Sequence, residues 1–449
     1  MQYSRRQSCV VELLVYCLFP GGNNMKYILS IILFILTFIS IEANNKIDSL
    51  FKEKRFFELR DQIRQSNTEW QNSCDGKFYA SFIDNAFGKL KKSDHLINQI
   101  LSECHSTMPD SMKYLLYELL IDNYTKESEY SKALSYYKKL NSVTDDSITI
   151  SKRSSYQNMI QLYEAMADLP PLKVNKNNKE HYIPLHRNGM GHYVVPVTIN
   201  ENSENFVFDS GANMNVLTRS MAKKMNVQIF DKHQVDVGTS TDHTIQAQIG
   251  FSPSVKIGDL ELENAVFLIL PDELLNFSAV NYKINGIIGY PVMREMEEMI
   301  IGKEGLLYLP SSPTVSNVNN IFMDGLSPIL FSEFNNKPIQ LLFDTGSTGS
   351  QLFRDFYVDN NKEVEANGEK TDISIGGAGG ITRVNCYAWK DFPLKIANQL
   401  ISIPLVHIIT DELGNNKKVV DGVVGQNVAD QFDEMVLNLK DMYLIFRNK

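Results

Sequence analysis

The segment Phe206-Val-Phe-Asp-Ser-Gly-Ala212 is matched further along the chain by Leu341-Leu-Phe-Asp-Thr-Gly-Ser347. Each segment is an apolar run that ends in an aspartate, a hydroxyl residue and a glycine. A second pair of motifs, ending in Gly289 and Gly425, follows these two aspartates at spacings of 80 and 81 residues. Self-similarity at a nearly constant spacing indicates two structural copies of one unit.

The similarity of the two halves extends to the segments between and after the motifs. Residues 255–273 resemble residues 394–412, and both copies end in Asp-Glu. Residues 299–309 and 435–446 each have the pattern of two short strands around a charged turn. The repeated region is therefore predicted to be an all-β unit of two similar lobes related by a pseudo-two-fold axis.

These residues resemble the retropepsin-like and pepsin-like aspartic proteases, in which each of two lobes or subunits contributes one Asp-(Thr/Ser)-Gly loop. The resemblance covers roughly residues 182–447 and implies a single-chain protease unit with Asp209 and Asp344 as its catalytic pair. It also implies a supporting role for the residues around these aspartates and for the two later glycines. The supporting residues are Ser210, Gly211, Thr345, Gly346, Ser347, Gly289 and Gly425.

Charge explains the chemistry that such a pair performs. Two carboxylates held about 3 Å apart cannot both ionise, so they share one proton. The ionised member removes a proton from water, and the protonated member donates to the carbonyl oxygen of the peptide bond. Water is then the nucleophile, and no cofactor or metal is expected.

The two loops differ after the glycine, where Ala212 in the first corresponds to Ser347 in the second. In pepsin-like relatives a hydroxyl at this position donates to the neighbouring carboxylate. We therefore expect Asp344 to be the better hydrogen-bonded and more readily ionised partner, because a hydrogen bond to the charged form lowers a pKa.

Two glycine-containing segments are candidates for flaps that close over a bound peptide. Gly238 and Thr239 follow Asp209 by about 30 residues, and Gly376 and Gly377 follow Asp344 at a similar distance. Glycine at a hairpin tip permits a mobile lid that approaches the substrate backbone closely. A plain flexible turn is the alternative interpretation of the Gly-Gly-Ala-Gly-Gly run.

The N-terminal residues have the pattern of a secretory leader. Lys26 is followed by the apolar run 27–41 and by Ala43, so residues 25–43 are interpreted as a signal peptide and the residues before Met25 as an over-long start. The protein is expected to be exported to a periplasm or the cell exterior, with an uncleaved membrane anchor as the alternative.

The domain organisation follows from changes in composition. Residues 44–169 contain few glycines and prolines and have apolar residues at helical spacing, with a loose similarity to a tetratricopeptide unit. Their aromatic stripe is interpreted as core. Residues 170–180 are expected to be a linker, and residues 181–310 and 318–449 the two lobes. The helical part is interpreted as an inhibitory pro-segment, a docking module for a protein partner or a stabilising domain.

The composition limits the classes of ligand that the protein is expected to bind. The net charge is −9, which disfavours nucleic acid and anionic membrane as ligands. Beyond residue 43 the chain has Cys74, Cys104 and Cys386, so a Cys74 to Cys104 disulfide and buried free thiols are both open. His181, His186 and His192 are interpreted as surface or packing residues rather than metal ligands.

The sequence thus predicts an exported aspartic endopeptidase with a helical N-terminal domain. A peptide or protein is the expected substrate, bound as an extended strand. The alternatives are a catalytically silent relative that binds peptides, and an interaction protein whose main function lies in its helical domain.

Overall fold

The computed structural model describes residues 45–143, 148–238, 244–278, 281–377, 380–412 and 420–448. Internal contacts divide the chain into two compact units, residues 1–62 and 63–449. In the first unit, the described residues are helical over 45–52, and helix α3 (Phe56–Gln65) begins there. The predicted leader, residues 1–43, and the flap candidate Thr239 lie outside the described residues.

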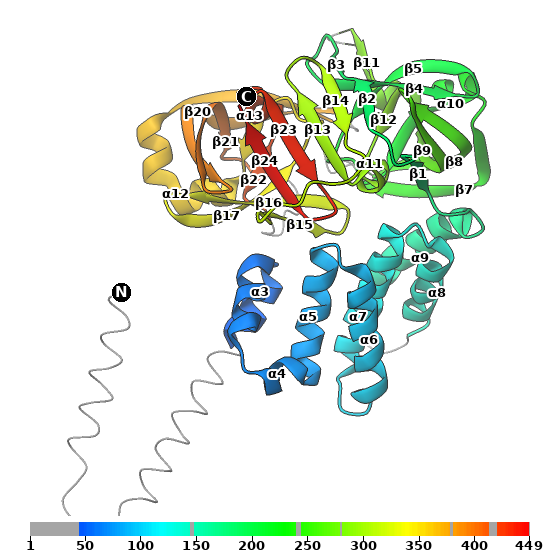
Figure 1. The fold of residues 1–449 in the computed structure, drawn as a ribbon, viewed down its shortest axis with the longest axis vertical. Helices are drawn as coiled ribbons and strands as arrows, with labels where there is room; N and C mark the ends of the chain where they lie inside the picture. Colours follow the sequence, from blue (N-terminus) through cyan, green and yellow to red (C-terminus); the bar gives the residue numbers. More distant parts are fainter. Residues whose placement is uncertain are drawn as a thin grey trace, which may run out of the picture. The chain divides into compact units, whose positions relative to one another are not determined.

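A series of helices opens the second unit, and helices adjacent in sequence contact one another (Figure 1). Side-chain caps mark two of the helix starts: Ser73 Oγ accepts from Gly76 N at 3.1 Å, and Thr149 Oγ1 accepts from Lys152 N at 3.2 Å. Of the aromatic stripe, Tyr117 and Tyr130 are buried, whereas Tyr114, Tyr124 and Tyr137 are half-buried. These helices are α4 (Thr68–Asn72), α5 (Cys74–Ala86), α6 (Leu90–Glu103), α7 (Asp110–Lys126), α8 (Tyr130–Asn141) and α9 (Ile150–Met166).

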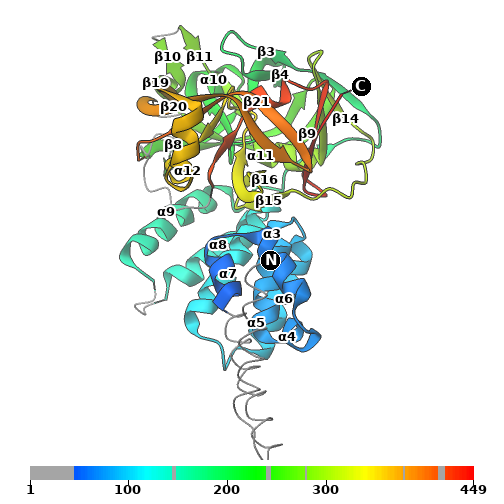
Figure 2. The same ribbon diagram turned by 90° about the vertical axis from the view of Figure 1, so that its left-hand side faces the viewer.

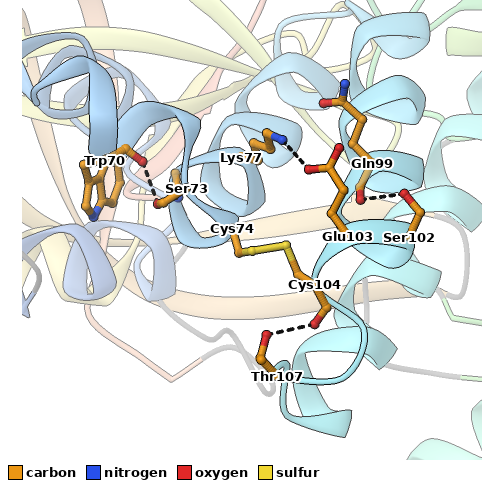
Figure 3. The surroundings of a disulfide bond; sticks show 10 residues. Trp70, Ser73, Cys74, Lys77, Gln99, Ser102, Glu103, Cys104 and Thr107 are labelled. Atoms are coloured by element: carbon orange, nitrogen blue, oxygen red, sulfur yellow. Dashed lines mark hydrogen bonds and ion pairs between the residues drawn. A yellow bond between two sulfur atoms is a disulfide. The ribbon is translucent and has the colours of Figure 1, made fainter.

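A disulfide joins Cys74 at the start of α5 to Cys104, the residue that follows α6 (Figure 3). An ion pair between Lys77 Nζ and Glu103 at 2.7 Å connects the same two helices. Cys386 is a buried free thiol. The cysteine count left open a Cys74 to Cys104 disulfide or buried free thiols at these positions, and the structure contains the disulfide.

Removing this disulfide is expected to destabilise the helical part. The crosslink closes a loop with a sequence separation of 30 residues, so chain entropy predicts a loss of about 3 to 4 kcal/mol of unfolding free energy. Urea unfolding followed by circular dichroism, with and without reductant, measures the loss. A Cys74→Ala/Cys104→Ala variant is the control and should not respond to reductant. An unchanged midpoint after complete reduction would contradict the prediction.

The first lobe is built on a sheet with the strand order β1-β9-β6-β12-β5-β4-β8-β7, with β3 paired to β4. Helix α10 (Arg219–Lys224) contacts β6 and β9, and the short strands β10 (Asn276–Phe277) and β11 (Tyr282–Lys283) form a separate hairpin. The strands of the main sheet are β1 (Lys173–Asn175), β3 (His186–Arg187), β4 (Tyr193–Ile199), β5 (Asn202–Phe208), β6 (Asn215–Thr218), β7 (Gln228–Gly238), β8 (Thr244–Ile257), β9 (Leu260–Leu270) and β12 (Gly286–Ile288).

The second lobe has the strand order β15-β16-β17-β22-β18-β21-β20-β19, and helix α12 (Arg354–Asn367) packs on β19 to β21 (Figure 2). Phe334, Phe356 and Phe392 fill the space between this helix and the sheet. The strands are β15 (Ile321–Asp324), β16 (Ser327–Phe334), β17 (Lys337–Phe343), β18 (Ser350–Leu352), β19 (Gly368–Gly377), β20 (Gly380–Ile396), β21 (Gln399–Ile409) and β22 (Gly422–Val424).

The two sheets repeat one arrangement of strands. In the first lobe, β5 pairs parallel with β12, which pairs antiparallel with β6. In the second lobe, β17 pairs parallel with β22, which pairs antiparallel with β18. Strand β6 then pairs parallel with β9, as β18 does with β21. The predicted fold class, a helical region followed by an all-β unit of two similar lobes, is confirmed.

A third sheet connects the lobes, with the order β2-β14-β13-β23-β24. The two closing hairpins predicted from the sequence, β13 with β14 and β23 with β24, are present. The central pairing of β13 with β23, from Glu298 opposite Asn438 to Gly302 opposite Glu434, joins the two copies. The strands are β2 (His181–Pro184), β13 (Glu298–Gly302), β14 (Leu306–Leu309), β23 (Glu434–Asn438) and β24 (Tyr443–Arg447).

The segment predicted as a linker, residues 170–180, is partly a strand. Lys173, Val174 and Asn175 pair with Glu263, Leu262 and Glu261 of β9. The Asn264 side chain donates to the Pro171 carbonyl at 3.0 Å. The edge of β9 offers free backbone groups, and this polar segment satisfies them.

Among the described residues, no helix is long and apolar enough to cross a membrane.

Candidate active site

The two Asp-(Ser/Thr)-Gly loops follow β5 and β17, and the fold brings them together. Asp209 N donates to the Ile288 carbonyl and Asp344 N to the Val424 carbonyl, both at 3.0 Å. Each aspartate is therefore fixed by the supporting strand of its own lobe, β12 or β22. Both aspartates are half-buried.

Four hydrogen bonds join the two loops, and each of them involves Ser210 or Thr345. Ser210 N donates to Thr345 Oγ1 at 2.9 Å, and Thr345 N donates to Ser210 Oγ at 3.0 Å. Each hydroxyl then donates across the axis, Ser210 Oγ to the Phe343 carbonyl at 2.9 Å and Thr345 Oγ1 to the Phe208 carbonyl at 2.8 Å. Ser210 and Thr345 are 1% and 2% exposed, so water does not replace these bonds.

Removal of either hydroxyl is expected to destabilise the protease unit. Ser210→Ala or Thr345→Val leaves a buried backbone N–H and C=O without partners, at a cost of about 1 to 3 kcal/mol for each unsatisfied group. The double variant should deviate from additivity by more than about 0.5 kcal/mol, because the two hydroxyls belong to one network. Urea unfolding of the two single variants and the double variant measures this.

An exposed hydroxyl pair in the same lobe offers the control. Thr198 Oγ1 and Ser203 Oγ lie 2.7 Å apart on the β4–β5 hairpin. The matched substitutions Thr198→Val and Ser203→Ala should change stability by less than about 0.5 kcal/mol. Equal losses in the buried pair and the exposed pair would contradict the locking role of Ser210 and Thr345.

The glycines of the two loops allow the carboxyl groups to approach each other. A Cβ atom on Gly211 would lie 2.7 Å from Asp344 Cγ, and one on Gly346 would lie 2.4 Å from Asp209 Cγ. Within each loop the glycine amide donates to its own aspartate, Gly211 N to Asp209 Oδ1 at 2.8 Å and Gly346 N to Asp344 Oδ1 at 2.7 Å. Each carboxyl group therefore contacts the backbone of both loops.

The two carboxyl groups form one interacting pair. Burial raises the pKa of Asp209 well above its usual value, and the charge of Asp344 and its hydrogen bond raise it further. Burial also raises the pKa of Asp344, but the hydrogen bond from Asp209 and the amides of Gly346 and Ser347 oppose this rise. The two groups therefore titrate together, with raised pKa values that belong to the pair.

The Ser347 hydroxyl does not form the hydrogen bond to Asp344 that the difference between the two loops predicted. Ser347 Oγ donates to the Gly349 carbonyl at 2.8 Å, whereas the Ser347 amide contacts Asp344 Oδ1 at 3.2 Å. The first loop has the same kind of contact, since the backbone amide of Ala212, which corresponds to Ser347, lowers the pKa of Asp209. The prediction that the hydroxyl itself donates to Asp344 was wrong.

The two supporting glycines lie directly beneath the loops. A Cβ on Gly289 would lie 2.5 Å from the Ala212 carbonyl oxygen, and one on Gly425 would lie 2.6 Å from the Ser347 carbonyl oxygen. Gly289 N donates to Asn215 Oδ1 at 3.0 Å, and Gly425 N donates to Ser350 Oγ at 3.1 Å. Only a residue without a side chain fits between each strand end and the loop above it.

The remaining candidate residues are at hairpin ends. Gly238 ends β7 and pairs with Thr244, while Gly376 and Gly377 end β19, where Gly377 pairs with Gly380. Strand β19 is largely exposed along its length. Both segments are therefore glycine-containing ends of long hairpins, as predicted.

Sequence reasoning missed the cluster of His192, Tyr282 and Asn188. The His192 ring stacks on Tyr282 with centroids 5.6 Å apart, and the charge of Asp344 acts on the pKa of His192. Tyr282 is 90 residues from His192 and lies on a two-residue strand, so no periodicity signals the contact. No group of His, Cys, Asp and Glu residues suited to a metal ion is present in the described part of the chain.

Comparisons with known proteins agree with this geometry. Residues 195–292, which include the Asp209 loop and Gly289, match the model of the aspartyl protease family. A solved structure of a retropepsin-like aspartic protease from Rickettsia conorii is 23% identical over 31% of this chain and 92% of that chain, with a TM-score of 0.22. The search of curated proteins found no match. The family match over residues 195–292 confirms the resemblance to aspartic proteases that the paired motifs predicted.

Proposed function

We propose that this protein is an exported aspartic endopeptidase that uses Asp209 and Asp344 as a shared-proton pair. The main support for the proposal is the direct contact between the Asp209 loop and the Asp344 loop. Each loop glycine lies against the opposite carboxyl group, and four hydrogen bonds through Ser210 and Thr345 hold this arrangement. A pair of interacting carboxyl groups with raised pKa values that shares one proton is what general acid and general base catalysis by one site requires.

The two members of the pair take complementary roles in the proposed mechanism. Asp344 in its ionised form removes a proton from a water molecule, and the water oxygen bonds to the carbonyl carbon of the substrate. Asp209 in its protonated form donates its proton to the carbonyl oxygen. The amine nitrogen of the tetrahedral intermediate then takes up the proton held by the pair, and the C–N bond breaks. One hydroxyl of the intermediate returns its proton to the pair as the new carboxyl group forms, which restores one shared proton.

Two hairpins are suited to cover an extended substrate. The β7–β8 and β19–β20 hairpins each follow a candidate catalytic loop and end in glycine-containing segments. An extended peptide would pair its backbone with them and place alternate side chains in pockets. We propose that Gly238, Gly376 and Gly377 allow these hairpins to act as flaps.

Export is supported by the leader-like pattern of residues 25–43 together with the disulfide. Disulfides persist in oxidising compartments such as the periplasm and the cell exterior. The Cys74 to Cys104 bond in the helical part fits such a compartment.

Peptide cleavage tests the proposed function directly. The purified protein is incubated with a complex peptide mixture from acid to neutral pH, and mass spectrometry identifies new peptide ends. The double variant Asp209→Asn/Asp344→Asn is the control for contaminating proteases. New ends with the wild-type protein alone are expected. Their absence at every pH would overturn the proposal and favour a peptide-binding relative without activity.

A further inference from the structure

The turn between β3 and β4 in the first lobe reaches the catalytic loop of the second lobe. A Cβ on Gly191 would lie 3.4 Å from Thr348 Cγ2, four residues after Asp344. Arg187, on the same hairpin, donates to Gln426 and Asp430 of the second lobe. Gln426 Nε2 in turn donates to the Thr345 carbonyl at 2.5 Å. The turn is therefore held at a fixed place beside the Asp344 loop.

The orientation of Asn188 in this turn is determined by two backbone donors. Asn188 Oδ1 accepts from Met190 N at 2.9 Å and from His192 N at 3.1 Å. An amide oxygen accepts and an amide nitrogen donates, so the nitrogen must be the atom that faces away from this turn. Asn188 Nδ2 accordingly donates to the Tyr282 hydroxyl at 2.7 Å.

This orientation favours one tautomer of His192. The Tyr282 hydroxyl accepts from Asn188 Nδ2 and has one proton of its own to donate, and His192 Nδ1 lies 3.1 Å away, so the hydroxyl is placed to donate to that nitrogen. A neutral imidazole whose Nδ1 accepts carries its proton on Nε2. Burial lowers the pKa of His192, which favours this neutral form, although the charge of Asp344 opposes the shift.

The Nε2–H group is left as a donor near the candidate catalytic pair. The His192 side chain is half-buried, and none of the described residues accepts a hydrogen bond from Nε2. Asp344 is close enough for its charge to act on the imidazole. A partly buried N–H donor without an acceptor among the described residues can donate to a carbonyl oxygen of a bound peptide.

We propose that His192 is a substrate-binding residue whose Nε2–H donates to a backbone carbonyl of the peptide on the Asp344 side of the scissile bond. Asn188 and Tyr282 are positioning residues that hold the imidazole in the donating tautomer. This inference rests on the proposed protease function, and it names the class of substrate group that the first lobe recognises beyond the carboxyl pair.

Two substitutions of His192 distinguish its two nitrogens. The Gln side chain places an N–H group near the position of Nε2, whereas the shorter Asn side chain places one near Nδ1. His192→Gln should keep kcat/KM within about threefold of the wild type, and His192→Asn should lower it about tenfold, the loss expected for one hydrogen bond. His186→Gln, on the exposed strand β3, is the matched control and should leave kcat/KM unchanged.

A spectroscopic measurement tests the network without relying on activity. In ¹⁵N NMR spectra, the resonances that disappear in His192→Gln belong to His192, and they should show the Nε2–H tautomer. Tyr282→Phe removes the donor to Nδ1 and should shift the population toward the Nδ1–H tautomer. An Nδ1–H tautomer in the wild-type protein would overturn the inference.

The two measurements separate the possible failures. A wild-type protein that cleaves peptides, combined with equal activity of His192→Gln and His192→Asn, would overturn the role of His192 and leave the proposed function intact. A wild-type protein that cleaves nothing would overturn the proposed function and with it the substrate role of His192. Thermal unfolding of each variant shows that the loss is not one of folding.

Discussion

Replacement of either Asp209 or Asp344 by asparagine is expected to lower kcat/KM for peptide cleavage about 10³-fold or more. Asparagine has nearly the same shape but neither shares nor transfers the proton, so both the acid and the base function are lost together. Initial rates on a peptide identified in the mixture measure the effect. Asp391→Asn makes the same substitution at an exposed site on β20 and should retain full activity.

The same variants should be more stable than the wild type at neutral pH. Both carboxyl groups have raised pKa values in the folded protein, from a usual value of 3.8, so the folded state binds their protons more tightly than the unfolded state does. Their ionisation therefore destabilises the fold progressively as pH rises above about 4. Asparagine removes this penalty, and the difference from the wild type should disappear in strong acid.

Activity and stability that change in opposite directions would exclude misfolding as the cause of inactivity. A variant that loses activity and also unfolds more easily at neutral pH would contradict the acidity assigned to the pair. Retained cleavage in either single variant would contradict the dyad mechanism itself.

The second large effect is expected for Gly346→Ala. The added methyl group would lie 2.4 Å from Asp209 Cγ, which is closer than real contacts allow, so the two loops must separate or the carboxyl group must turn away. Overpacking of this kind costs about 1 to 3 kcal/mol of stability. Because a small displacement of reacting groups has a large effect on rate, kcat/KM should fall about 10²-fold.

The same loop contains the control for this substitution. A methyl group on Gly349 would meet no atom within 4 Å, and the backbone there does not require glycine. Gly349→Ala should therefore retain activity and stability. Gly211→Ala should behave like Gly346→Ala, since its methyl group would lie 2.7 Å from Asp344 Cγ. Equal behaviour of Gly346→Ala and Gly349→Ala would contradict the close approach of the two loops.

Much of the protease unit could be predicted from short segments of sequence. Apolar runs that end in Asp-(Ser/Thr)-Gly, later supporting glycines and paired closing hairpins are local patterns, and their repetition indicated two lobes before any contact was known. The closing hairpins have the predicted pairing because residues close in sequence form them. Strand β1 was missed because a polar segment of three residues has no apolar alternation and pairs only because the edge of β9 is available.

The local sequence was therefore sufficient for the repeated strands, the glycines and the identity of the two aspartates. Three features depended on long-range packing: the pairing of β13 with β23, the raised pKa values of Asp209 and Asp344, and the contact of His192 with Tyr282. Burial, electrostatic interaction and hydrogen bonding depend on which groups surround a side chain in space. Segments distant in the chain supply those groups, so only the folded structure decides the acidity of the carboxyl pair and the partners of His192.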